Sequence, residues 1–272
     1  MMKSKRKLLY VILFVFAMYF SALPVSAASS NYVSGYYGTK TIGQYQVKVG
    51  ENGLYSRKGH SGKWKKLSSN CRAYVTNGSK IYFAKDNYNY LYDTGNTTIY
   101  LGSIRGGKNQ SVVTIRNRAV DRFYYYKDKL YIQERRGKFE NSISVYSLKT
   151  QKYRILQKGS LLTVYNGYGI TSDNTTIKYT YPLYSVNLSS EKKKKIASYC
   201  YGHENSGKYL YFASFTKDIR AYQDPGTFVV KRVSVNGSGS KTLTTKLYGI
   251  VREVTSKYVE YEKNGVTRRM YY

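Results

Sequence analysis

Short runs of alternating apolar and polar residues, separated by turn residues, fill the chain after about residue 30. Such a two-residue period is typical of β-strands. One stretch predicts four strands in succession: Cys71–Thr76, Lys80–Lys85, Tyr88–Tyr92 and Thr97–Leu101. The Asn77-Gly78 dipeptide between the first two favours a hairpin turn, and Tyr88, Tyr90 and Tyr92 are expected to share one face. Helical patterns are almost absent, so the chain is predicted to be all-β.

The same strand pattern recurs along the chain. Residues 65–83 align with residues 194–212 without a gap, placing Cys71 on Cys200 and Gly78 on Gly207. One apolar position recurs every 40 to 48 residues, at Leu67, Ile115, Leu156, Ile196 and Leu243. Units of about 40–45 residues with four short strands are typical of β-propeller blades. A single such sheet cannot bury both faces, so the units must stack around an axis.

The spacing of the units predicts six blades, with five or seven as alternatives. The first unit covers about residues 31–67, four full units follow, and the last, about 244–272, has room for three strands. We expect the ring to close where this short last blade meets the segment Asn31–Tyr37. Because blades depend on their neighbours, residues 28–272 are predicted to form a single domain.

The first 27 residues have the pattern of a secretory signal peptide. Met1–Lys7 carries four positive charges, Leu8–Phe20 is continuously apolar, and Val25-Ser26-Ala27 is a small-residue cleavage site. The apolar run is short for a membrane span, which needs about 20 residues. We therefore expect cleavage after about Ala27 and a secreted or cell-wall-associated protein with no further membrane span.

The charge is strongly positive, at +30 for the whole chain. Without the four basic residues before Leu8 it is 30 minus 4, or +26. Such an excess predicts attraction to polyanions, and for an exported protein these are anionic wall polymers or acidic glycans. The expected location and the absence of a recognisable motif argue against nucleic acid. Several basic residues lie where a blade's outermost strand is expected, and there they would also discourage sheet aggregation: Lys65, Lys66, Arg154, Lys192–Lys195 and Lys241.

Tyrosine is unusually frequent, with 34 in the chain. Most fit half-buried sheet positions, because tyrosine has a high strand propensity and an amphipathic ring. Some clusters are denser than packing requires, and rings beside basic residues can stack on sugars or bind cations. The candidate contact residues are Tyr124, Tyr125, Tyr126, Tyr179, Tyr181, Lys193 and Lys194.

No catalytic or metal-binding pattern stands out, and no cofactor or metal is expected. His203-Glu204, placed in an expected loop, is a candidate acid–base pair, but the favoured interpretation is an exposed turn histidine. The 15 carboxylates are scattered, without the tight ligand spacing that zinc or calcium sites need. A glycosidase would need two convergent carboxylates, and no pair is singled out.

The two cysteines occupy the same position in units three apart. In a six-bladed ring that position puts Cys71 and Cys200 on opposite sides, whereas a disulfide needs Cα atoms within about 7 Å. Both are therefore predicted to be buried free thiols that act as small apolar residues.

The recurring unit, with its turn glycine, its Tyr-aromatic strand and its basic-basic-Leu strand, resembles secreted bacterial β-propellers of unknown function. The residues on which this resemblance rests are Asn77–Phe83, Leu91-Tyr92 and Lys194–Ile196. These proteins are similar in fold to the YWTD propellers of lipoprotein receptors, although that tetrad does not occur here. The resemblance covers the chain after the signal peptide. It implies the fold and export, and it transfers no active site.

Together these features predict a secreted, monomeric, non-catalytic binding or scaffold propeller. Its partner would be an anionic wall polymer, a glycan or a surface protein. Two alternatives stay open: a glycan hydrolase or lyase with carboxylates at the mouth of the channel, and a protein–protein interaction module of a surface assembly. Facing carboxylates would favour the enzyme, a basic-aromatic surface would favour binding, and an exposed apolar patch would favour the interaction module.

Overall fold

The computed structural model describes residues 33–35, 38–89, 92, 94–137, 140–173, 179–219, 221 and 224–272. The predicted signal peptide lies outside these residues. Every regular element in the described part of the chain is a β-strand, and the strands pair antiparallel. No helix in these ranges has the length and apolar character to span a membrane. The all-β prediction is therefore confirmed.

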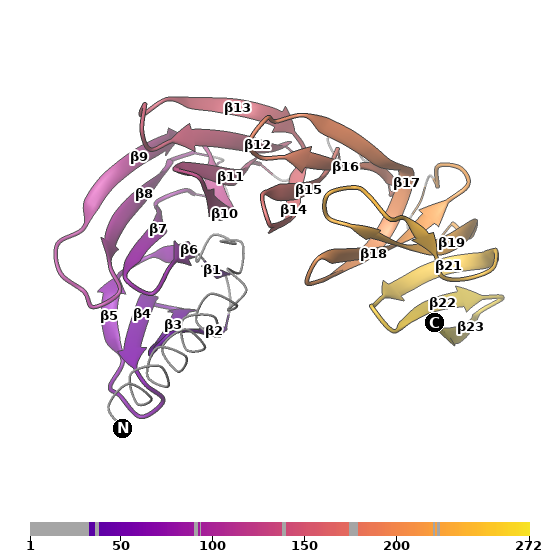
Figure 1. The fold of residues 1–272 in the computed structure, drawn as a ribbon, viewed down its shortest axis with the longest axis horizontal. Coiled ribbons are helices and arrows are strands. Elements are labelled where there is room, and N and C mark those ends of the chain that lie inside the picture. The colour runs from indigo at the N-terminus through magenta and orange to yellow at the C-terminus, as the bar shows by residue number, and fades with distance from the viewer. Residues whose placement is uncertain are drawn as a thin grey trace, which may run out of the picture.

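The strands form six successive sheet units, which we call blades 1 to 6 (Figure 1). Blade 1 contains β2 (Thr39–Ile42), β3 (Tyr45–Gly50), β4 (Gly53–Lys58) and β5 (Lys65–Ser68). Blade 2 contains β6 (Cys71–Thr76), β7 (Lys80–Asp86), β8 (Asn96–Ser103) and β9 (Gln110–Arg116), with the short β1 (Val33–Gly35) added beside β6. Blade 3 contains β10 (Ala119–Tyr126), β11 (Lys129–Arg136), β12 (Glu140–Ser147) and β13 (Tyr153–Lys158).

The later blades are joined by strands that belong to two units. Blade 4 contains β14 (Ser160–Tyr165), β15 (Tyr168–Ser172), β16 (Tyr181–Asn187) and the first part of β17 (Lys193–Ser206). Blade 5 contains the second part of β17, β18 (Tyr209–Phe215), β19 (Gly226–Ser234) and β20 (Lys241–Thr242). Blade 6 contains β21 (Leu247–Val254), β22 (Tyr258–Lys263) and β23 (Val266–Tyr271). The start of β21 still pairs with β19, so it too crosses from one blade to the next.

The blades stack face to face in an arc, and each of the five interfaces has its own apolar core. In β11, for example, Leu130 and Ile132 pack towards blade 2, while Tyr131 packs towards blade 4. A strand buried on both faces reads as a nearly continuous apolar run rather than a clean alternation. Burial of these rings and aliphatic chains is the main source of stability, at roughly 25 cal/mol per Å².

Hydroxyl groups also connect neighbouring blades. The Oγ of Ser56 donates to the carbonyl of Ile104 in the next blade at 2.6 Å, and the Oγ of Ser185 donates to that of Val235 at the same distance. Ile104 and Val235 follow the third strands of their blades and are buried. Each contact therefore satisfies a buried polar pair and fixes how one blade sits on the next.

Two local predictions are wrong. Tyr88 is buried whereas Tyr92 is 75% exposed, so these two side chains do not share a face. In the described part of 88–92 only an isolated bridge from Asn89 to Thr94 occurs, and the fourth strand of this blade is β9. The predicted closure also differs: within Asn31–Tyr37, the described Val33–Gly35 pairs with β6 of blade 2. No strand pairing among the described residues joins blade 1 to blade 6.

Candidate binding site on the inner strands

The first strand of each blade after blade 1 carries a one-residue irregularity in its pairing with the second strand. A β-bulge of this kind bends the strand and re-aims side chains, and it often lies beside a functional site. The residue left out of the paired register is Arg72, Asp121, Leu162, Gly202 and Arg252 in blades 2 to 6 respectively. A regular feature of the fold therefore directs one residue per blade away from the ladder.

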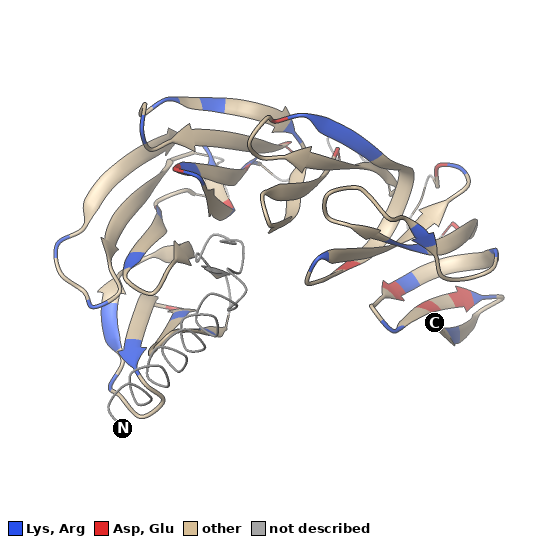
Figure 2. Ribbon diagram, viewed as in Figure 1, with Lys and Arg blue, Asp and Glu red and all other residues tan. Residues whose placement is uncertain are grey.

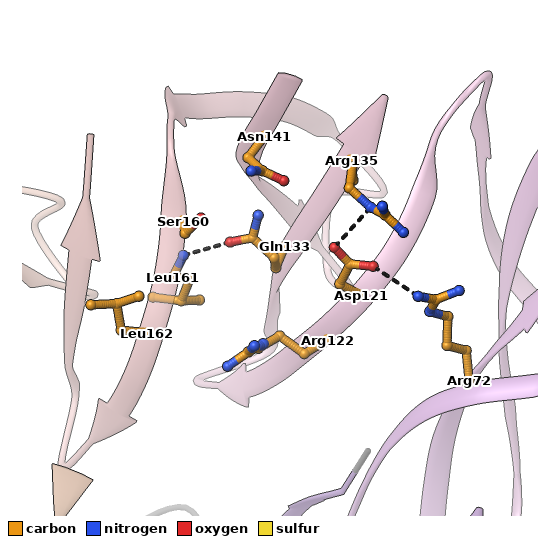
Figure 3. Close-up of a pocket in the computed structure, with 9 residues that line it drawn as sticks. All are labelled: Arg72, Asp121, Arg122, Gln133, Arg135, Asn141, Ser160, Leu161 and Leu162. Atoms are coloured by element: carbon orange, nitrogen blue, oxygen red, sulfur yellow. Dashed lines mark hydrogen bonds and ion pairs between the residues drawn. The ribbon is translucent and has the colours of Figure 1, made fainter. Parts of the chain in front are cut away.

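Three successive bulge residues border one cavity, of about 410 Å³, which we call the inner cavity (Figure 3). Arg72, Asp121 and Leu162 come from β6, β10 and β14, which lie on the inner side of the arc (Figure 1). Because of the bulges, the consecutive residues Asp121 and Arg122 both reach the cavity. Arg135 of β11 completes its charged side.

The carboxylate of Asp121 lies between two guanidinium groups. One oxygen is 3.4 Å from Nη2 of Arg72, and the other is 3.5 Å from Nε of Arg135. Arg72 extends the row, since its Nη1 lies 3.6 Å from the carboxylate of Asp86. These side chains are about a quarter exposed or less. Both carboxylates are therefore neutralised by arginine.

Arg122 is the exception in this row. It is exposed, and no carboxylate in the described part of the chain forms an ion pair with it. Its neighbour Tyr124 is partly buried; loss of solvent contact raises the pKa of that phenol, and the guanidinium of Arg122 offsets part of the effect. Arg122 thus brings an unneutralised positive charge to the inner cavity.

The opposite wall of the cavity contains both polar and apolar groups. The side-chain oxygen of Gln133 accepts a hydrogen bond from the backbone N–H of Leu161, which ties blade 3 to blade 4 (Figure 3). Leu161 and Leu162 supply the apolar part, and Asn141 and Ser160 add further hydrogen-bonding groups. This combination suits a ligand that carries an anionic group beside an apolar or hydroxylated body.

A second cavity, of about 480 Å³, also has Arg72 among its lining residues. Glu51 and Asp86 are among its lining residues, together with Cys71. It is therefore more acidic than the inner cavity, and Arg72 lines both.

The site offers little to acid–base or metal chemistry. No group of three or more His, Cys, Asp or Glu residues in the described ranges could hold a metal ion. His203 and Glu204 lie in strand β17 and not in the expected loop. His203 contacts the hydroxyl of Tyr181 at 3.2 Å, while Glu204 accepts a hydrogen bond from the backbone N–H of Ser256. Burial, with a smaller contribution from Arg122, lowers the pKa of His203.

The sequence-predicted contact residues do not gather in one place. In β10, Tyr124 and Tyr126 pack towards blade 4, whereas Tyr125 stacks on Tyr82 of blade 2 with ring centroids 5.9 Å apart. Tyr179 packs in the interface of blades 5 and 6, and Tyr181 in that of blades 4 and 5. Their common role in the structure is packing between blades.

The basic candidates lie on the strand that pairs with the strand of Tyr181, but near its other end. Lys193 and Lys194 are exposed at the start of β17, where this strand is the outermost one of blade 4. Lys65, Arg154 and Lys241 likewise lie on the outermost strands β5, β13 and β20 (Figure 2). They form no part of the inner cavity.

Cys71 and Cys200 are buried free thiols on the innermost strands of blades 2 and 5. Cys71 belongs to the core between blades 1 and 2, and Cys200 to the core between blades 4 and 5. Burial raises the pKa of both thiols above their usual range. Both side chains thus serve as small apolar groups.

The arginines of the inner cavity were not among the sequence-predicted site residues. The available signal was the presence of charged residues inside otherwise apolar inner strands, as in Cys71-Arg72-Ala73 and Val120–Phe123. The corresponding position in the next two blades holds Leu162 and Gly202. No recurring residue type therefore marks the position in the sequence.

Comparison with known proteins supports the fold alone. No family model matches the chain, and no curated protein matches its sequence. A structure from a study of two prolyl endopeptidases is similar over 88% of this chain and 42% of its own, with 13% identity and a TM-score of 0.53. The β-propeller domain of the Trilobed protease from Pyrococcus furiosus matches with 11% identity over 87% of this chain and 80% of its own, with a TM-score of 0.48. A putative TolB from Agrobacterium tumefaciens matches with 13% identity over 79% of this chain and 82% of its own, with a TM-score of 0.46.

The chain spans less than half of the endopeptidase structure, and at these identities the likeness concerns architecture alone. With its successive four-stranded antiparallel sheets, the chain has the β-propeller fold.

Proposed function

We propose that this protein is an exported, monomeric, non-catalytic binding propeller that holds an anionic polymer or glycan of the cell envelope at its inner cavity. The observation that carries the proposal is Arg122, an exposed guanidinium without a carboxylate partner in the described residues, beside a cavity whose carboxylates are already paired. An incoming carboxylate or phosphate would supply the missing counter-charge through charge-assisted hydrogen bonds.

The charge of the whole chain supports the same partner. At +26 after removal of the four basic residues of the signal peptide from +30, the protein would attract a polyanion over a long range and bind it in a salt-dependent way. Residues 1–27 support export, and an anionic wall polymer would then be the polyanion at hand. The resemblance of the repeat to secreted bacterial propellers agrees with this location.

The competing proposal of a glycan hydrolase or lyase has less support. Such an enzyme needs one carboxyl group that can donate a proton and a second that acts as nucleophile or base. Asp86 and Asp121 are the carboxylates on either side of Arg72, and each forms an ion pair with arginine. A row of paired charges suits recognition better than proton transfer.

The test is retention of the protein by an anionic wall polymer at low and at high ionic strength. Arg122→Ala should weaken binding at least about tenfold, as expected for the loss of a hydrogen bond between charged groups. Lys149→Ala is the matched control, because it removes one exposed positive charge from the β12–β13 turn. Equal affinities of the two variants would contradict the assignment to the inner cavity, and binding that ignores salt would contradict the electrostatic basis.

A further inference from the structure

Blade 1 carries a large positive charge that the fold does not neutralise. Residues 39–68 contain one carboxylate, Glu51, against seven basic residues, which gives a net charge of +6; the seven are Lys40, Lys48, Arg57, Lys58, Lys63, Lys65 and Lys66. None of the seven takes part in an ion pair between described residues. The positive charge of this blade is therefore available to a partner.

The blade at the other end of the arc is different. Residues 247–271 contain five basic residues and three glutamates, a net charge of +2. Two ion pairs cross its strands, Arg252 with Glu262 and Arg269 with Glu260. A terminal repeat with a polar outer face whose charges pair with one another needs no partner. Blade 1 lacks this internal pairing.

Two cationic side chains of blade 1 lie beside aromatic rings on one face of the blade. Val47 and Leu54 point into the core with blade 2, so strand alternation puts Lys48, Tyr55 and Arg57 on the opposite face. There the Nζ of Lys48 and the Cζ of Arg57 each lie 4.5 Å from the ring centroid of Trp64. Lys48 also lies 5.9 Å from the ring of Tyr55. We call Lys48, Tyr55, Arg57 and Trp64 the blade 1 patch.

The guanidinium in this patch is held in place by a buried amide. Gln46 is 7% exposed, and its side-chain oxygen accepts a hydrogen bond from Nε of Arg57 at 2.8 Å. Its amide nitrogen lies 2.9 Å from Nδ1 of His60, so both ends of the amide are used. Arg57 is thereby oriented beside Trp64 before any ligand arrives, which lowers the entropy lost on binding.

We propose that the blade 1 patch is a second binding surface, and that its ligand is an acidic polysaccharide built from uronate residues. A uronate combines a flat pyranose ring, which suits the indole of Trp64, with a carboxylate on the same ring, which suits Arg57 and Lys48. The remaining basic residues of blade 1 would attract further carboxylates along the polymer. This surface is separate from the inner cavity, so the two proposals can fail independently.

The experiment uses the fluorescence of Trp64, which is the only tryptophan of the chain. The full chain is titrated with oligogalacturonate, with its methyl ester and with polyphosphate of similar length. Oligogalacturonate should give a saturable change in emission, and the ester, which keeps the rings but lacks the charge, should bind at least about tenfold more weakly. Equal binding of the ester, or an equal emission change and affinity with polyphosphate, would overturn the proposal.

Variants assign the signal to the patch. Arg57→Ala should reduce the affinity at least about tenfold, and Arg57→Lys, which keeps the charge but loses the planar fork, should reduce it less. Lys263→Ala, which removes an exposed positive charge from blade 6, should leave the titration unchanged. An emission change that grows with protein concentration alone would mean that a second copy covers the patch, and this would overturn the proposal. The proposal would also be overturned if both Arg57 variants melt like the parent protein and bind oligogalacturonate with unchanged affinity.

Discussion

Replacing Asp121 by asparagine should strengthen the binding of an anion at the inner cavity. The carboxylate of Asp121 lies within 3.5 Å of guanidinium groups of both Arg72 and Arg135, and it cancels part of their charge. Asparagine has almost the same shape and no charge. The substitution therefore leaves the cavity in place and makes it more positive.

The size of the effect follows from Coulomb's law. An anionic group about 6 Å from the Asp121 carboxylate, at an effective dielectric constant of about 40–80, is repelled by about 0.7–1.4 kcal/mol. Removing that repulsion should raise the affinity by roughly three- to tenfold. The two ion pairs that are lost are partly exposed, so each should contribute only about 0.2–1 kcal/mol to folding stability.

The assay is calorimetric titration of the full chain with an anionic oligosaccharide at low ionic strength. Asp128→Asn is the control, because it removes the same charge from the turn after β10, where Asp128 accepts a hydrogen bond from Tyr125 at 2.7 Å. A gain confined to Asp121→Asn supports a binding site of positive charge. A loss of affinity in this variant would refute the reasoning, since it would mean that the carboxylate itself recognises or transforms the ligand.

Four further predictions concern buried groups and one backbone position of the blades. Tyr153→Phe should lower the free energy of unfolding, measured in urea, by about 1.5–3 kcal/mol, because the hydroxyl lies 2.7 and 2.8 Å from the oxygens of the buried Glu134 carboxylate; a change below about 0.5 kcal/mol would contradict this. Burial raises the pKa of Glu134 above 4.5, so between 4.5 and the folded-state pKa the folded protein holds a proton that the unfolded chain has released. The free energy of unfolding should therefore fall as the pH rises through this range. Glu134→Gln should flatten that slope in urea titrations at several pH values. Gly159 has a φ of 105°, and a Cβ there would collide with the carbonyl oxygen of Ser172, so Gly159→Ala should cost about 1–3 kcal/mol and lower Tm; an unchanged Tm would argue against this backbone. Burial raises the pKa of the Cys200 thiol, so a thiol reagent should modify it only on unfolding, and rapid reaction in the native protein would contradict its position.

The repeat made the outer part of each blade predictable. Leu67, Ile115, Leu156 and Ile196 all lie on outermost strands, and Leu243 directly follows β20. These positions recur because every blade has the same requirement there, an apolar residue that anchors the last strand. The Asn77-Gly78 turn is likewise found between β6 and β7, because few dipeptides allow so tight a connection.

The inner cavity and the connection after β7 could not be predicted in the same way. Arg72 and Asp121 meet because bulges on two blades aim them at one another, and a bulge has no fixed sequence signal. Tyr88 and Tyr92 have the spacing of a strand, but a strand also needs a neighbour with which to pair. Tyr88 instead lies beside blade 3, where its hydroxyl accepts a hydrogen bond from the backbone N–H of Gly137 at 3.4 Å.

Among the described residues, the series of blades begins with blade 1 and ends with blade 6, and no strand pairing joins these two. In a closed ring each unit is held on both sides, whereas in the described part of this chain blade 1 packs on blade 2 and blade 6 packs on blade 5. The array should then behave as a line of coupled units, in which unfolding begins at either end and advances inward. Amide protons of the middle sheets would be the last to exchange with solvent, and the first and last sheets could open transiently while the rest of the arc stays folded.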